Sequence, residues 1–340
     1  MQDQQQTADA AGFERQIERF QQTYEAIAGQ LAAVIVGHQQ ATEEILACIL
    51  SGGHALLEGV PGLGKTLLVR TLAEALDLSF SRIQFTPDLM PADITGTNMV
   101  EADAAGTKAF RFEAGPVFAH LVLADEINRA TPKTQSAVLE AMQEHTVSVA
   151  RTTHRLPAPF FVLATQNPLE MEGTYPLPEA QLDRFLLKVV VRSPDVGELV
   201  GILDRTTGAA VPHATCVADA KTILEMQELV RRVPAAAPVK NYVARVVRAT
   251  HPAAELAPAS ARKYVRYGSS PRGAQAILLA AKVRALRAGR ANVAIEDARA
   301  AAAPALRHRL ILSFEGQADG VGADDLIAEI IREMPRAEVE

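Results

Sequence analysis

The stretch Gly59-Val60-Pro61-Gly62-Leu63-Gly64-Lys65-Thr66 follows a short apolar run, 54–58, and precedes an apolar helical pattern at 67–76. It matches G-x-x-x-x-G-K-[ST], in which backbone N–H groups of a glycine-rich loop surround phosphate oxygens. The start of the following helix adds a favourable dipole, Lys65 neutralises the β- and γ-phosphates, and Thr66 ligates Mg²⁺. The predicted nucleotide-binding residues of this loop are Gly59, Pro61, Gly62, Leu63, Gly64, Lys65, Thr66 and Leu67.

Short apolar runs alternate with helical patterns around this loop. The runs are 54–58, 80–85, 120–124, 160–164 and 185–191. Because each run is apolar throughout, we expect strands that are covered on both faces. The pattern predicts an α/β fold with a five-stranded parallel sheet and helices on both faces.

Past the last apolar run the sequence changes to helical stretches rich in Ala, Leu, Val and Arg, separated by proline and glycine. We predict a flexible N-terminal tail at 1–12, an α/β core at 13–193 and an all-α lid domain at 194–340. Two turn-rich stretches of the core, at about 93–115 and 146–156, predict inserted β-hairpins.

The composition excludes several classes of protein. Hydrophobic residues make up 48% and charged residues 22%, which excludes wholesale disorder. The formal charge of −6 disfavours generic binding to nucleic acid. Cys48 and Cys216 are too few for a disulfide framework. There is no signal-peptide pattern and no run of 18 apolar residues, so we expect a cytoplasmic protein without membrane insertion.

Polar side chains follow two of the predicted strands. Asp125 and Glu126 end the run at 121–124, and a parallel strand would bring both carboxylates beside the glycine-rich loop. There Asp125 is suited to hold Mg²⁺, and Glu126 to polarise an attacking water. Asn167 ends another buried strand and is suited to orient that water. Taken alone, these residues also fit a helix cap and an Asn-Pro turn.

Together these motifs resemble the AAA+ ATPases. The stretches 115–118, 125–130 and 172–185 resemble the MoxR family within that group, and Ser270-Pro271-Arg272 resembles its second-sensor motif. The resemblance covers about residues 30–312, and the order and spacing of the motifs make it specific.

The resemblance implies roles for further residues, with ATP and Mg²⁺ as cofactors. Val36 and Gly37 match the turn beside the adenine, and Asn167 matches the first sensor. Arg184 matches the arginine finger that acts on the ATP of a neighbouring subunit. Arg272 matches the second sensor, expected to reach the γ-phosphate of its own subunit. The plainer alternatives are a surface pair of Arg184 with Asp183, and a cation at a helix start for Arg272.

The resemblance also implies a function. It implies an ATP-driven, chaperone-like remodeller or activator of a protein partner, assembled as a ring of six subunits. The partner would be a separate protein with a von Willebrand factor A domain. The hairpins would face the central pore or a partner, or be plain surface loops. The alternatives are a nucleic-acid motor or loader, which the net charge disfavours, and the motor subunit of a metal chelatase.

Overall fold

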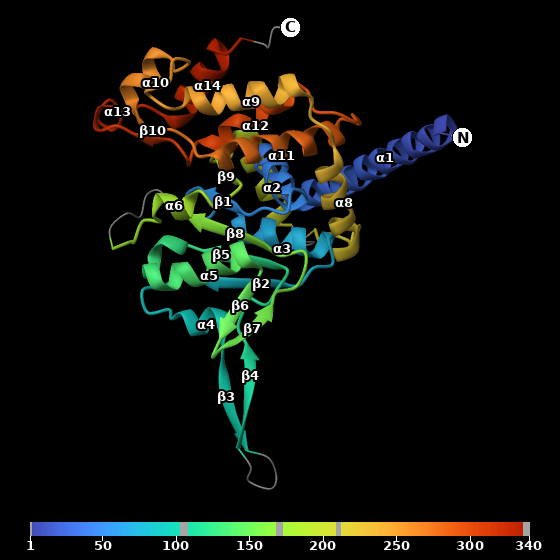
Figure 1. Cartoon of the computed structure of the whole chain (residues 1–340). Helices are drawn as coiled ribbons and strands as arrows, with labels where there is room; N and C mark the ends of the chain where they lie inside the picture. The colour runs from blue at the N-terminus through green and yellow to red at the C-terminus, as the bar shows by residue number, and fades with distance from the viewer. Residues whose placement is uncertain (1, 103–107, 168–172, 209–211, 336–340) are drawn as a thin grey trace.

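The computed structural model of the chain describes residues 2–102, 108–167, 173–208 and 212–335. Its main sheet has five parallel strands in the order β2-β5-β8-β1-β9 (Figure 1). The strands are β1 (Ala55–Glu58), β2 (Phe80–Gln84), β5 (Leu121–Asp125), β8 (Phe161–Gln166) and β9 (Leu187–Val190). The predicted parallel five-stranded α/β core is confirmed.

Two layers of buried side chains cover the two faces of this sheet. Successive residues of a strand point to opposite faces, so each apolar run supplies both layers. Leu57 and Leu163 belong to the layer shared with α1, α2, α3 and the lid. Leu56 and Val162 belong to the other layer, which packs against α5. This arrangement explains why the strands are apolar throughout.

The helices fall into two groups along the chain. Those before the last strand are α1 (Gln2–Val34), α2 (Gln39–Leu50), α3 (Lys65–Ala75), α4 (Pro91–Thr95), η1 (Ile127–Arg129), α5 (Pro132–Glu144) and α6 (Glu179–Leu182). Those after it are α7 (Val196–Thr206), α8 (Ala220–Arg232), α9 (Ala237–Ala249), α10 (Ala259–Tyr264), α11 (Pro271–Arg287), α12 (Ile295–Leu306), α13 (Phe314–Ala318) and α14 (Ala323–Glu333). The second group forms the lid, and its helices α9 to α14 lie at the top of Figure 1.

Two expectations about the ends of the chain need correction. The predicted loose tail is helical from Gln2, since α1 runs without a break to Val34. The stretch before Gly12 is rich in Gln and Ala, which favour helix, and lacks proline. The lid is also not purely helical, because β10 (Val265–Tyr267) and β11 (Ile311–Leu312) pair antiparallel. These strands are too short to give a periodic pattern.

The structure has a hairpin at each of the two places expected from the sequence. β3 (Gly96–Ala102) pairs with β4 (Lys108–Ala114), and β6 (Thr146–Val149) pairs with β7 (Thr152–Arg155). Residues 103–107 of the first insertion lie outside the described residues. The β3–β4 hairpin projects away from the body, on the side opposite the lid (Figure 1).

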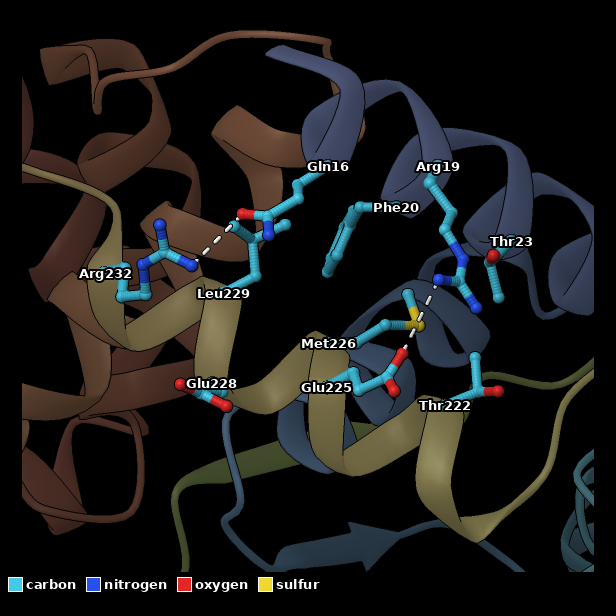
Figure 2. Close-up of a pocket in the computed structure, with 10 residues that line it drawn as sticks. All are labelled: Gln16, Arg19, Phe20, Thr23, Thr222, Glu225, Met226, Glu228, Leu229 and Arg232. Carbon is cyan, nitrogen blue, oxygen red and sulfur yellow. Dashed lines mark hydrogen bonds and ion pairs between the residues drawn. The ribbon is translucent and has the colours of Figure 1, made fainter. Parts of the chain in front are cut away.

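Helix α8 packs back onto α1, so the chain after β9 is tied to its beginning. Figure 2 shows the groove between these helices, a pocket of about 230 Å³ beside Phe20. Arg19 lies 3.7 Å from the Glu225 carboxylate, and Arg232 donates to the Gln16 side chain at 3.1 Å. These contacts hold the middle of α1 against α8.

Among the described helices, we find none that is both long enough and apolar enough to cross a membrane.

A buried histidine at the start of β1 predicts a pH-dependent stability. His54 Nδ1 accepts from the Val162 N–H at 3.0 Å, so the ring is neutral and Nε2 donates to the Met142 carbonyl at 2.9 Å. Burial lowers the pKa of His54 to about 4 from 6.5. Because the unfolded chain binds this proton more tightly, the folded state loses stability as the pH falls from 6.5 towards 4, by about 3 kcal/mol for this group.

Urea unfolding of the wild type and His54→Gln across this range measures the difference. We expect the wild type to lose more unfolding free energy on acidification than the variant. Parallel pH profiles would contradict the assignment.

Candidate nucleotide-binding site

The glycine-rich loop joins β1 to α3 at the carboxyl edge of the sheet. Gly62 and Gly64 have φ angles of 84° and 72°, a left-handed conformation that glycine adopts without strain. Lys65 Nζ donates to the Gly59 carbonyl at 2.7 Å, closing the loop. Burial lowers the pKa of Lys65, opposed by the nearby carboxylates of Asp125 and Glu126. The loop therefore presents N–H groups, a helix N-terminus and a cation to one point, as an anion site requires.

The two predicted acidic residues lie at the end of β5, beside this loop. Glu126 has a φ of 56°, a left-handed conformation unusual for a residue with a side chain. The Thr165 hydroxyl of β8 donates to Asp125 Oδ1 at 2.7 Å and accepts from the Glu126 N–H at 2.8 Å. Thr165 thus fixes the orientation of both acidic residues.

Both carboxylates are also held by basic or amide groups. Arg82 on β2 donates to Asp125 Oδ2 through Nε at 3.0 Å and Nη2 at 2.7 Å. Gln84, also on β2, donates to Glu126 Oε2 at 2.9 Å, and Arg129 donates to the same oxygen at 3.0 Å. The oxygens suited to Mg²⁺ and to an attacking water are therefore occupied by protein donors in this structure.

The residues present fit a Mg²⁺ ion bound together with a nucleotide. Asp125 and Thr66 offer hard oxygen ligands, which Mg²⁺ prefers. The described residues include no group of three or more His, Cys, Asp or Glu side chains able to hold a metal by themselves. Mg²⁺ is commonly held by one or two carboxylates plus substrate phosphates, and this donor set matches that arrangement.

The first-sensor candidate lies at the same edge. Asn167 is buried and directly follows β8, which lies between β5 and β1 in the sheet. It is thus placed between the acidic residues and the glycine-rich loop. The neighbouring Pro168, and Glu172 at the start of the family-like stretch, lie outside the described residues.

The turn expected beside the adenine lies under α7. Gly37 has a φ of 69°, and a Cβ there would collide with the Glu198 carboxylate of α7. Val36 packs against Gly201 of the same helix. Val36 and Gly37 line a cavity of about 500 Å³, which is within the usual range for small-molecule sites.

The two predicted arginines lie elsewhere. Arg184 follows α6 and donates to the Leu139 carbonyl of α5 at 2.7 Å. Arg272 begins α11 and lies 3.7 Å from the Asp183 carboxylate. Both arginines, together with His54, line a pocket of about 200 Å³.

This pocket lies at the amino edge of the sheet. Leu187, the first residue of β9, pairs with Ala55, the first residue of β1, whereas the glycine-rich loop follows Glu58 at the other end. A four-residue strand spans about 10 Å, and the loop lies beyond it. The expectation that Arg272 reaches the γ-phosphate of its own subunit is therefore not met in this structure. The parallel register of β9 on β1 places Arg272 and the glycine-rich loop at opposite edges of the sheet.

Comparisons with known proteins agree with this geometry. Residues 54–187 match the profile described as the ATPase family associated with various cellular activities (AAA), and residues 258–330 match the AAA lid domain. The chain is 42% identical over 317 residues to the protein named Chaperone MoxR1 of Mycobacterium tuberculosis, covering 93% of this chain and 83% of that protein.

Two further likenesses extend over most of the chain. It is 34% identical over 304 residues to the protein named MoxR of Paracoccus denitrificans, covering 83% of this chain and 87% of that protein. The crystal structure of a putative ATPase from Cytophaga hutchinsonii superposes with a TM-score of 0.90 at 37% identity, covering 97% of this chain and 99% of that one. The chain belongs to the MoxR family of AAA+ ATPases.

Sequence reasoning missed several residues of this MoxR-family site. Arg82 and Gln84 alternate with the buried Ile83 in the run at 80–85, so they share one side of β2. Their contact with the acidic residues depends on the pairing of β2 with β5, which places Gln84 opposite Asp125. Thr165 was visible as a polar residue at a strand end, but its partners depend on the same sheet order.

The pair between Arg82 and Asp125 predicts competition with Mg²⁺. We expect Arg82→Gln to lower the half-saturating divalent-ion concentration by a factor of about 1.4 to 5, since a partly exposed ion pair contributes about 0.2–1 kcal/mol. Mn²⁺ binding with a non-hydrolysable ATP analogue measures this directly. Arg129→Gln is the matched control, because Arg129 contacts Glu126 instead. An unchanged affinity in Arg82→Gln, or an equal change in both variants, would refute the competition.

Proposed function

We propose that this chain hydrolyses ATP in a ring, most simply of six subunits, and that Arg184 and Arg272 of one subunit act on the ATP of the next. The observation that carries the proposal is the separation of both arginines from the glycine-rich loop across the sheet. Of the cations that the described residues place at this edge, Lys65 belongs to the glycine-rich loop, while Arg82 and Arg129 are held by Asp125 and Glu126, so the γ-phosphate calls for one further cation. A second copy supplies that cation.

Each residue then has a defined task. Lys65 and the N-terminus of α3 bind the phosphates, and Mg²⁺ held near Asp125 and Thr66 neutralises charge on them. Glu126 accepts the proton of the attacking water, while Asn167 orients that water. Arg184 of the neighbour stabilises the charge that spreads onto the γ-phosphate oxygens, a contribution worth about 10³-fold or more in rate.

Exposed apolar residues of the projecting β3–β4 hairpin support the proposal that this protein binds a protein partner. Met99, Val100 and Phe110 of the β3–β4 hairpin are 49%, 56% and 79% exposed. Val100 and Phe110 are directly opposite each other across the ribbon. Contiguous exposed apolar groups on a projecting element mark a site for binding another protein. Arg111, which is opposite Met99 on the other face of the ribbon, is paired with Glu101 at 3.0 Å.

We therefore propose remodelling of a protein over a nucleic-acid motor. A surface for nucleic acid needs a concentration of positive charge, which the apolar and ion-paired groups of this hairpin do not supply. The name of the mycobacterial relative, Chaperone MoxR1, agrees with the proposal. As the family resemblance implies, the expected partner is a separate protein with a von Willebrand factor A domain.

Trans action by Arg184 predicts a dependence on assembly. Specific ATPase activity should rise with protein concentration as subunits associate. Arg184→Ala should retain ATP binding and lose about 10³-fold in kcat, whereas Lys65→Ala should lose ATP binding itself. Steady-state kinetics and fluorescent-nucleotide titration separate the two effects. Normal turnover by Arg184→Ala, or a flat specific activity across the assembly range, would refute the role.

The partner can be sought with a trapped ATP state. Glu126→Gln should bind ATP and hydrolyse it slowly, so we would use it as bait with ATP and Mg²⁺ in lysate of the source organism. Lys65→Ala is the control without nucleotide, and Glu126→Gln with Phe110→Ser tests the hairpin. We expect ATP-dependent capture of a protein with a von Willebrand factor A domain, reduced by Phe110→Ser. Recovery of nucleic acid alone would favour the motor.

A further inference from the structure

One buried arginine of the lid contacts the short segment that carries Arg184. This segment, residues 183–186, joins α6 to β9, and we call it the finger segment. Arg309 follows α12, and its side chain is only 3% exposed. Its Nε donates to Asp183 Oδ1 at 2.8 Å, and its Nη2 donates to the carbonyls of Asp183 at 3.1 Å and Phe185 at 2.6 Å.

The remaining donors of Arg309 continue the same pattern. Nη1 donates to the Leu186 carbonyl at 3.1 Å and to the Ala305 carbonyl of α12. A guanidinium has five N–H donors in a fixed plane, and here all its contacts but one go to the finger segment. His308 Nε2 adds a contact with the Phe185 carbonyl at 3.1 Å.

The Asp183 carboxylate binds a second part of the lid. The Ser270 hydroxyl, at the start of α11, lies 2.9 Å from both carboxylate oxygens. The guanidinium of Arg272 lies 3.7 Å from Oδ2. A single carboxylate next to Arg184 therefore joins the finger segment to the ends of two lid helices and to the second-sensor arginine.

These contacts hold the lid and the finger segment together, so that neither can be displaced without the other. Burial lowers the pKa of Arg309, and the Asp183 carboxylate opposes that shift. A buried charge that loses its partner is strongly destabilising, so a displacement of the lid that left the finger segment behind would be costly. Because the five donors of the guanidinium lie in one plane, these contacts fix the orientation of the finger segment relative to Arg309 as well as its distance.

We propose that Asp183 and Arg309 are positioning residues that fix Arg184 and Arg272 relative to each other and to the lid. Both arginines of one subunit then approach the ATP of the next subunit together, in a geometry that the contacts between the lid and the finger segment determine. This inference rests on the proposed action of Arg184 in trans.

Arg307 provides a matched control at the same helix end. Its side chain is buried, its Nη1 donates to the Lys188 carbonyl of β9 at 3.0 Å, and its Nε pairs with Asp324 at 2.9 Å. It therefore also holds the lid to the sheet, but these contacts bypass the finger segment. A purely structural effect of weakening the lid should appear in both Arg307 and Asp183 variants.

The first measurement compares turnover with ATP binding. Asp183→Asn keeps the shape of the side chain and removes its charge. We expect unchanged ATP affinity and assembly, and a kcat lower by about 10- to 100-fold, the loss that a displacement of about 1 Å causes. Ser270→Ala, which removes one contact of the same carboxylate, should give a smaller loss. Arg307→Gln should keep kcat. Thermal unfolding of each variant checks that the protein is folded.

The second measurement distinguishes an effect on the neighbour from one on the subunit itself. Asp183→Asn subunits retain their own loop and Glu126, while Glu126→Gln subunits retain their arginines. We would co-express the two with different affinity tags and purify the mixed assemblies. We expect these to hydrolyse ATP faster than the sum of the separate variants, because Glu126→Gln subunits supply well-placed arginines to Asp183→Asn neighbours.

Arg184→Ala mixed in the same way tells the outcomes apart. Rescue of Arg184→Ala without rescue of Asp183→Asn overturns this inference and leaves trans action intact. Absence of rescue for Arg184→Ala overturns trans action, and the inference with it. A loss of kcat in Arg307→Gln equal to that in Asp183→Asn also overturns the positioning role.

Discussion

Parallel pairing of β8, β1 and β9 determines at which edge of the sheet each group of the candidate site lies. The carboxyl ends of these strands meet at one edge, so the glycine-rich loop, Asn167 and, from the adjacent β5, the two acidic residues share a site. The connection from α6 must return to the opposite edge before β9 can begin in register with β1. Arg184 lies on that connection, and α11 brings Arg272 to it. The sheet thus divides the candidate catalytic groups into two sets.

The two acidic residues at the carboxyl edge have several partners that hold them close together. Two neighbouring carboxylates repel each other, so positive charges and hydrogen-bond donors beside them are stabilising. Arg82 and Arg129 supply positive charge, and the uncharged donors Gln84 and Thr165 fix the geometry through hydrogen bonds to the carboxylates. Asp125 would hold Mg²⁺ that enters with a nucleotide, and the ion would then supply the positive charge that Arg82 supplies to this carboxylate in the present structure.

The sequence predicts this site where the chemistry is local and fails where it depends on sheet order. The glycine-rich loop, β1 and α3 follow one another in the sequence, so their conformation and the binding of a nucleotide could both be predicted. The two hairpins were likewise marked by turn residues within single stretches. Arg82 and Asp125 are 43 residues apart, and Arg309 and Asp183 are 126 apart, so their contacts exist only once the fold is known. Arg272 shows the remaining difficulty: its motif was visible, but only the register of β9 on β1 reveals which side of the sheet it lies on.

The packing of the lid indicates which motions remain available to couple the two edges. Buried side chains of α8, α9, α11 and α12 belong to the same continuous cluster as those of α1, α2 and one face of the sheet. Opening that cluster would expose apolar area at about 25 cal/mol per Å², so the lid is not free to swing as a separate body. Arg309 adds a polar contact that is equally costly to break. In the ring proposed above, nucleotide-dependent movement is therefore better accommodated between subunits, as small rotations of one rigid chain against the next, and such rotations would move Arg184 and Arg272 together.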